Sequence, residues 1–142
     1  MNRGFTTIEL LAIIGVIAIL TTIGVPSYRY MRQNVAVNTS AEEVVDVLRV
    51  AQNQSLTAQD GQSWGVHFAA TAYTLYSGDW TAPLFTAEYN LDSGVNIISA
   101  SLPEVEFSRL TGTSASGSIV VGLPSGKQKT ISVTPAGTIN LN

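Results

Sequence analysis

The sequence predicts an α+β fold, in which a long N-terminal helix packs on a small antiparallel β-sheet. Three patterns predict this fold. A charge-free apolar run stands near the start, an apolar stripe of helical period follows it, and the pattern changes to period two with β-branched residues from Gln62 onward. A length of 142 residues is enough for one domain with its own core.

Composition excludes several classes of protein. The charged fraction is 12%, about half of the roughly 25% usual in soluble domains, whereas a disordered chain is rich in charge. The formal net charge of −3 argues against nucleic acid as a partner, because phosphate binding needs a basic surface. The chain has no cysteine and a single histidine, His67, so disulfides and thiolate metal sites are excluded.

The apolar run covers nineteen residues, from Leu10 to Tyr28. A helix needs about 20 apolar residues to cross the hydrocarbon of a bilayer, so the run is just long enough. A secretory signal peptide would need a basic segment before the run and a small-residue cleavage site after it. Arg3 is the only basic side chain before the run, and residues 21–26 form a poor cleavage site. A membrane anchor therefore fits better than a signal peptide.

An acidic residue, Glu9, stands directly before this run. A carboxylate at that place is costly in lipid, which marks Glu9 as a candidate functional residue. The alternative is that Glu9 merely rests at the lipid headgroups.

Residues 3–10, Arg-Gly-Phe-Thr-Thr-Ile-Glu-Leu, resemble the cleavage and methylation signal of type IV prepilins and type II secretion pseudopilins. In that family a short leader ends in Gly, the next residue is usually Phe, and Glu is the fifth residue after the cut. Gly4, Phe5 and Glu9 match these positions, and Pro26 closes the apolar run as in many members. The resemblance covers residues 3 to about 28.

The resemblance implies a life cycle. A prepilin peptidase would cleave after Gly4 and methylate the amine of Phe5. The subunit would wait in the inner membrane, single-pass, with its head outside the cytoplasm. An inner-membrane assembly platform would then draw it from the lipid bilayer into a helical filament of pilin or pseudopilin subunits, periplasmic or extracellular. In the filament core, the Phe5 ammonium of a neighbour is the natural partner for the buried Glu9 carboxylate, and the pair would set the register.

The arginines around the run indicate the opposite orientation. Arg3 precedes the run, whereas Arg29 and Arg32 follow it. By the positive-inside rule the C-terminal side would be cytoplasmic. We follow the leader motif, and the conflict stays open.

The chain resumes a helical pattern after Pro26, and Asp60-Gly61 supply a stop signal that predicts a helix up to Gln59. Gly24 and Pro26 weaken a helix, so a kink or local melting is predicted there. The alternative is a proline kink without a role, while the resemblance implies a stretch that loosens for filament packing. The apolar stripe that should cover the sheet comprises Ala41, Val44, Val45, Leu48 and Ala51.

The predicted organisation therefore has four parts. They are a leader (1–4), a membrane and filament-core helix (5–28), an amphipathic helix half (29–60) and a β-rich head (61–142). Residues 78–83 are predicted as a loop and residues 111–118 as a flexible loop. The predicted strands are 64–68, 73–76, 95–98, 105–107, 119–121, 129–133 and 138–141, with a hairpin turn at 123–126.

The head resembles the minor pseudopilin H and FimT-like branch of the family at residues 51–55, 64–66 and 135–139. Some FimT-like members bind DNA through arginines near the C-terminal Gly. No arginine follows Gly137, which puts DNA binding in doubt. Lys127 and Lys129 are interpreted as a solvated strand edge that discourages aggregation.

No catalytic residue, cofactor or metal is predicted. His67 is interpreted as a structural strand residue rather than part of a Ser–His–Asp site. Glu104 and Glu106 should share one strand face, as an exposed acidic edge or, alternatively, as a calcium or paired-carboxylate site.

The chain is predicted to be a structural subunit of a type II secretion pseudopilus, of the minor class, or of a type IV pilus. The alternative is a FimT-like minor pilin at a filament tip that binds DNA or another ligand. A membrane-anchored enzyme is a third hypothesis.

Overall fold

The computed structural model describes residues 4–124 and 126–142, apart from the side chains of residues 23–26. The chain forms two compact units, Met1–Asn34 and Val35–Asn142. One long helix, α1 (Thr7–Leu56), contributes residues to both units. The side chains of Gly24 and Pro26 lie outside the described part of the chain, and the kink or local melting predicted there stays a prediction.

Helix α1 ends at Leu56, earlier than the predicted end at Gln59. Ala58 takes a left-handed conformation (φ 49°) that stops the helix, and a 3-10 turn, Gln59–Gly61, follows. Asp60 and Gly61 also have positive φ, so the stop signal lies in the turn that leads into the head.

The second half of α1 is amphipathic, as predicted. The buried residues recur at helical spacing and comprise Val37, Ala41, Val44, Val45, Leu48 and Ala51. Glu42, Glu43, Asp46 and Arg49 lie on the exposed side. Arg49 and Asp46 form an ion pair at 3.6 Å, but both side chains are well exposed, so the pair adds little stability.

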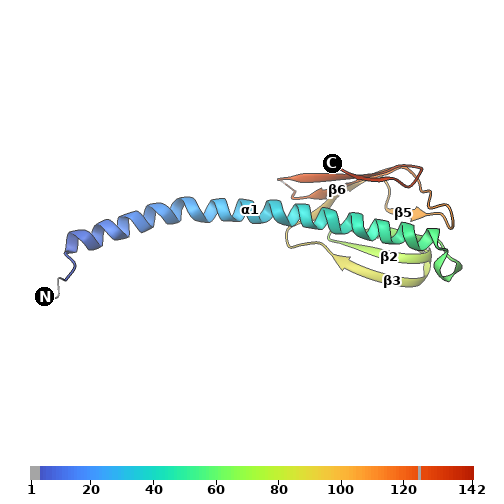
Figure 1. Cartoon of the computed structure of the whole chain (residues 1–142), viewed down its shortest axis with the longest axis horizontal. Helices are drawn as coiled ribbons and strands as arrows, with labels where there is room; N and C mark the ends of the chain where they lie inside the picture. The colour runs from blue at the N-terminus through green and yellow to red at the C-terminus, as the bar shows by residue number, and fades with distance from the viewer. Residues whose placement is uncertain (1–3, 125) are drawn as a thin grey trace. The chain divides into compact units, whose positions relative to one another are not determined.

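The head holds two antiparallel four-stranded sheets (Figure 1). The first sheet has the order β3-β2-β1-β5 and comprises β1 (Trp64–Phe68), β2 (Ala72–Asp79), β3 (Ala82–Asn90) and β5 (Glu104–Phe107). The second sheet has the order β4-β6-β7-β8 and comprises β4 (Asn96–Ala100), β6 (Gly117–Gly122), β7 (Gln128–Val133) and β8 (Ile139–Leu141). The predicted hairpin is confirmed, because β6 pairs with β7.

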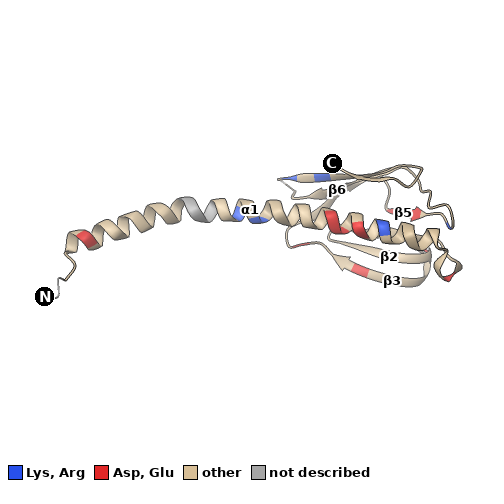
Figure 2. Cartoon of the chain, in the orientation of Figure 1, with Lys and Arg blue, Asp and Glu red and all other residues tan. Residues whose placement is uncertain are grey.

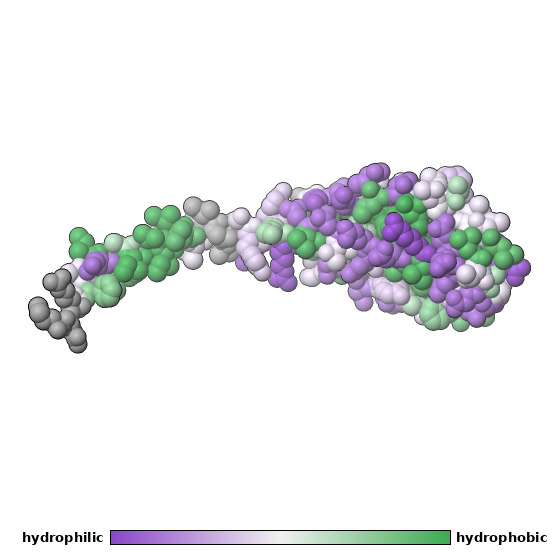
Figure 3. Space-filling view, in the orientation of Figure 1, coloured by the Kyte–Doolittle hydropathy of each residue, from purple (hydrophilic) through white to green (hydrophobic). Residues whose placement is uncertain are grey.

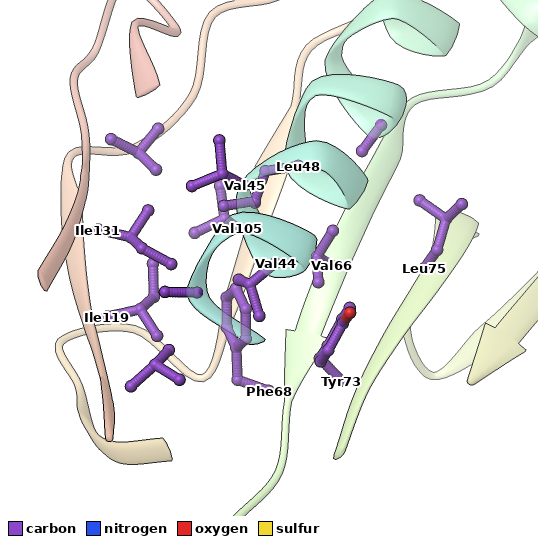
Figure 4. Packing of buried hydrophobic residues seen from close by; sticks show 14 of the residues in the cluster. Val44, Val45, Leu48, Val66, Phe68, Tyr73, Leu75, Val105, Ile119 and Ile131 are labelled. Carbon is purple, nitrogen blue, oxygen red and sulfur yellow. The ribbon is translucent and has the colours of Figure 1, made fainter. Parts of the chain in front are cut away.

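One core lies between the helix and the two sheets. Figure 4 shows Val44 and Leu48 of α1 between Ile119 and Ile131 of the second sheet and Val66 of the first. All five side chains are at most 1% exposed, and burial of each stabilises the fold by about 1.5–3 kcal/mol. A helix stripe wide enough to face two sheets therefore joins them into one head.

The predicted antiparallel β-sheet head is confirmed, and the strands divide into two sheets because β4 pairs with β6 and β5 with β1. One expectation for the head was wrong in detail. The loop predicted at 78–83 is shorter than expected, because Pro83 lies in the edge strand β3, where a missing N–H can be tolerated. That strand, Ala82–Asn90, was missed. Nearly all of β3 is exposed, so it lacks the buried alternation that reveals a strand.

Candidate functional site

The junction of Gly4 and Phe5 lies in non-helical chain just before α1. The Phe5 side chain is 76% exposed, and a Cβ added at Gly4 would meet no atom within 4 Å. Gly4, Phe5, Thr6 and Glu9 line an open hollow of about 270 Å³. The peptide bond between Gly4 and Phe5 is thus exposed in irregular backbone, the form in which a peptidase can bind it.

Glu9 and Thr6 cap the start of α1. The Glu9 carboxylate accepts hydrogen bonds from the Thr6 backbone N–H (3.1 Å) and the Thr6 hydroxyl (3.0 Å), and the Glu9 N–H donates to Thr6 Oγ1 (3.3 Å). This reciprocal arrangement is a capping box, whose sequence signal, Thr followed three residues later by Glu, sequence reasoning overlooked. In the single subunit Glu9 therefore has a local structural role beside the register role proposed for it.

The first unit exposes its apolar side chains. All described residues from Gly4 to Thr22 are exposed, and Figure 3 shows a mostly apolar surface along the first part of α1, with a hydrophilic patch near its start. α1 contains an 18-residue window of mean hydropathy 2.5 with none of it buried, which is long and apolar enough to cross a membrane. The hydroxyls of Thr21 and Thr22 donate to the Ile17 and Ala18 carbonyls at 2.6 and 2.7 Å, so both are satisfied within the helix.

The arginines after the apolar segment still indicate a membrane orientation opposite to the one that the leader motif implies. Glu9 lies near the start of α1, and Arg29 and Arg32 are exposed farther along it (Figure 2). The arginines after the apolar run therefore remain free to contact a headgroup layer, and their number still opposes the orientation that the leader motif implies.

Ser55 joins the last turn of α1 to the first sheet. Its fully buried Oγ accepts a hydrogen bond from the Trp64 N–H (2.9 Å) and donates to the Phe107 carbonyl (2.9 Å). Trp64 begins β1 and Phe107 ends β5, so one hydroxyl ties the helix to two neighbouring strands.

Gln52, three residues before Ser55 on α1, joins the helix to the turn between β7 and β8. Its Nε2 donates to the Gly137 carbonyl (2.8 Å) and the Gly112 carbonyl (3.3 Å). Residues 51–55 and 135–139, two stretches that carry the resemblance of the head, therefore meet through Gln52 and Gly137. Segment 111–118, expected as a flexible loop, is held at Gly112 by this contact and at Ser114 by a bridge to Phe107.

We predict that Ser55→Ala destabilises the head. The substitution leaves the Trp64 N–H buried without a partner, which costs about 2 kcal/mol. Thermal unfolding of the full chain in detergent, followed by tryptophan fluorescence, measures the loss. The matched control is Ser118→Ala at an exposed position of β6, which should leave the midpoint nearly unchanged. Equal midpoints for the two variants would contradict the role of Ser55.

The outer face of the first sheet carries His67, interpreted above as structural, and Glu104 and Glu106, for which a calcium or paired-carboxylate site was the alternative. The strand register places His67 opposite Glu104 on β5, and Gly65 opposite Glu106, so the two carboxylates share one face as predicted. His67 stacks on Trp80 with ring centroids 3.9 Å apart and planes within 6°. His67 therefore has an aromatic packing role. In the described part of the chain no three His, Asp or Glu side chains gather as metal ligands.

Two buried tyrosines lie on this sheet. The Tyr76 ring covers Gly65, and its hydroxyl donates to Glu104 Oε2 at 3.3 Å. Burial and the nearby carboxylates of Glu104 and Glu106 raise the pKa of Tyr76 well above its usual value. On the inner face, burial raises the pKa of Tyr73 to about 12, with a smaller contribution from Glu43. Both tyrosines are thus neutral packing residues.

Comparison with known proteins shows which sequences and solved structures this chain resembles. No protein-family model matches the chain. Over 33 residues (22% of this chain) the sequence is 58% identical to "Prepilin peptidase-dependent protein D" of Escherichia coli (strain K12), and the match spans 23% of that protein's length.

Two solved structures of the minor pseudopilin EpsH from the type II secretion system of Vibrio cholerae are similar to this chain. The first has a TM-score of 0.57 at 16% identity, and the match covers 75% of this chain and 95% of the solved EpsH chain. The second has a TM-score of 0.57 at 13% identity, with coverages of 75% and 92%. The likeness shows that the long N-terminal helix packed on antiparallel sheets is the pseudopilin fold.

Proposed function

We propose that this chain is a structural subunit of a type II secretion pseudopilus, of the minor pseudopilin class. One observation carries the proposal: the Gly4–Phe5 junction and Glu9 stand at the start of an exposed apolar helix, and the same helix ends in a head of pseudopilin fold. A FimT-like pilin that binds DNA is less well supported, because no arginine follows Gly137.

In this proposal the leader and the helix act in sequence. A prepilin peptidase cleaves after Gly4 and methylates the new amine at Phe5. The apolar segment holds the chain in the inner membrane, with the head outside the cytoplasm, until the assembly platform moves it into the filament. Lipid covers the apolar side chains first, and neighbouring helices cover them afterwards, so these side chains never need to face water.

Glu9 gives the assembly its register. A carboxylate in the helix core of a filament is strongly unfavourable unless it is paired, and the Phe5 ammonium of an adjacent subunit is a partner of opposite charge. The capping contacts with Thr6 hold the Glu9 side chain at the end of α1, beside the residue that becomes the new N-terminus.

The proposal gives the head no catalytic step. His67 packs on Trp80, and the Tyr76 hydroxyl is bonded to Glu104, so packing and hydrogen bonding account for both side chains. The head would instead present surfaces to other subunits.

Mass analysis of the mature N-terminus tests the proposal. Expressed with a prepilin peptidase, the chain should lose residues 1–4 and begin at N-methylated Phe5. Gly4→Val is the matched variant: nothing lies within 4 Å of a Cβ at Gly4, so the fold is unaffected, and a loss of cleavage reports recognition by the peptidase. A wild-type chain that still begins at Met1 in a peptidase-competent cell would overturn the proposal.

A further inference from the structure

Two arginines carry all the charge of a long stretch of the sequence. Between Glu9 and Glu42, the charged residues are Arg29 and Arg32 alone. Both side chains are exposed, and Figure 2 shows two basic positions close together on α1, beyond the apolar first part of the helix. The function proposed above gives this pair of positive charges no role.

The two arginines share one side of α1 with a tyrosine. Arg29 and Arg32 stand three positions apart, and Tyr28 stands four positions before Arg32. Side chains at these spacings are neighbours on a helix, with Cβ atoms about 5–6 Å apart. Tyr28 is 68% exposed, so its ring is open to the surroundings of the helix, as the two guanidinium groups are. We call Tyr28, Arg29 and Arg32 the basic cluster.

The basic cluster is open to an external partner. In the part of the chain that the structure describes, the recorded ion pair joins Arg49 to Asp46, and the recorded arginine hydrogen bond joins Arg109 to the Gly61 carbonyl. Neither contact involves the basic cluster. A guanidinium group stays charged at every physiological pH, and its planar fork of N–H donors fits two oxygens of a phosphate at once.

The length of the apolar run places the basic cluster at the edge of a bilayer. From Leu10 to Tyr28, α1 rises about 27 Å, close to the roughly 30 Å of the hydrocarbon layer. Arg32 lies about 6 Å beyond Tyr28 along the helix, and the headgroup layer on each side is about 5–7 Å thick. When Glu9 lies in one headgroup layer, the basic cluster therefore lies in the other, whichever side faces the cytoplasm.

The chemistry of the basic cluster fits the phosphates of this layer. Tyrosine is enriched where a membrane helix meets the headgroups, because its ring is apolar and its hydroxyl is polar. Each arginine near an anionic lipid surface is attracted to it. The unit Val35–Asn142 carries nine acidic and four basic side chains, so its net charge gives it no such attraction. The preference for an anionic surface is thus concentrated in the basic cluster.

We propose that the basic cluster is a binding site for the phosphate groups of anionic phospholipids. The proposal rests on the membrane-anchored subunit proposed above, and with the head outside the cytoplasm the site lies in the outer leaflet of the inner membrane. The positive-inside rule alone disfavours arginines on that side of the apolar run. Lipid binding gives Arg29 and Arg32 a function there, independent of the orientation of the helix.

Energy transfer to labelled lipids tests the site. The wild-type chain has no cysteine, and Gln33 is exposed beside the basic cluster, so Gln33→Cys takes a single donor dye. The full chain is placed in nanodiscs of phosphatidylcholine that contain a trace of acceptor-labelled phosphatidylglycerol or, separately, of acceptor-labelled phosphatidylcholine. The anionic lipid should be enriched around the donor by at least about fivefold, the factor that one arginine contributes near an anionic surface.

Matched variants separate the basic cluster from net charge. Arg29→Gln with Arg32→Gln should reduce the enrichment to near one. Arg49→Gln with Lys127→Gln removes the same charge from the unit Val35–Asn142 and should keep the wild-type enrichment. Arg29→Lys with Arg32→Lys keeps the charge without the planar fork and should retain part of the enrichment. A salt concentration of about 0.5 M should remove most of it, because exposed charges are screened.

Three results would overturn the proposal. The first is equal enrichment in the wild-type chain and in Arg29→Gln with Arg32→Gln. The second is the same loss of enrichment in the control variant, which would show an effect of net charge. The third is displacement of the labelled lipid by millimolar inorganic phosphate, which would show a site for free phosphate instead of a lipid.

Processing keeps this test separate from that of the proposed function. Each variant is also expressed with a prepilin peptidase and checked for the loss of residues 1–4. A processed chain without lipid preference refutes this inference alone, whereas an unprocessed wild-type chain refutes the proposed function. If the arginine-to-glutamine chain kept its lipid preference but failed to enter filaments, the arginines would serve acidic groups of neighbouring subunits, and the lipid site would be refuted.

Discussion

Glu9→Ala is expected to enter the membrane normally but to be nearly absent from filaments. The substitution leaves the Phe5 ammonium of a neighbour without a partner in an apolar core, at a cost of about 3 kcal/mol or more, equivalent to a loss of roughly 100-fold in incorporation. Membrane insertion depends on the apolar run and should not change. The measurement is the ratio of the chain in sheared filaments to the chain in the membrane fraction.

The capping box calls for controls that separate charge from helix capping. Glu9→Gln keeps a side chain that can cap the helix but removes the charge, so it should fail in assembly as Glu9→Ala does. Thr6→Val removes the capping hydroxyl and keeps the carboxylate, so it should cost only about 1 kcal/mol of helix stability and retain most of the assembly. Normal incorporation of Glu9→Gln would refute the ion pair, and failure of Thr6→Val alone would assign Glu9 to capping.

Gly137→Ala is expected to cause the largest loss of stability in the head. Gly137 has a φ of 80°, which disfavours any side chain, and a Cβ there would collide with the Gly112 carbonyl oxygen and with Gln52 Nε2. The combined strain and overpacking should lower the free energy of unfolding by about 3 kcal/mol or more. Chemical denaturation of the full chain in detergent, followed by tryptophan fluorescence, measures the change.

The matched control for this prediction is Gly94→Ala. Gly94 also has a positive φ, 88°, but its added Cβ would only touch Leu123 at 3.9 Å. Gly94→Ala should therefore cost about 1 kcal/mol, the penalty for the backbone conformation alone. If the two variants lost the same stability, the crowding between Gly137, Gly112 and Gln52 would not be the cause.

Local patterns were sufficient for much of the fold. The apolar stripe from Ala41 to Ala51 predicted the buried face of α1, because helical spacing aligns those side chains whatever they pack against. The strand 64–68 and the β6–β7 hairpin were found for a similar reason, since alternation and a turn signal are properties of adjacent residues. The Thr6–Glu9 capping box was also visible in the sequence, and it was overlooked.

Local sequence patterns did not predict the exposed strand β3. β3 packs few side chains into the core, so its residues are not selected for alternation, and Pro83 near its start has the appearance of a loop residue. What makes Ala82–Asn90 a strand is its pairing with β2, from Ala72↔Asn90 to Asp79↔Ala82. Such pairing is a property of two segments, which a scan of one segment cannot reveal.

Residue order alone was enough to specify the membrane-length helix, its acidic start and the α+β class, because each depends on the spacing of nearby side chains. Only the tertiary structure showed how the strands divide into two sheets. It also showed the hydrogen-bond partners of Ser55 and Gln52. Gln52 and Gly137 are 85 positions apart, yet the Gln52 amide finds its acceptor there because the core brings β7 against α1. Contacts of this kind form when apolar side chains from distant segments are buried together. They therefore depend on the packing of the whole head and cannot be predicted from any one segment.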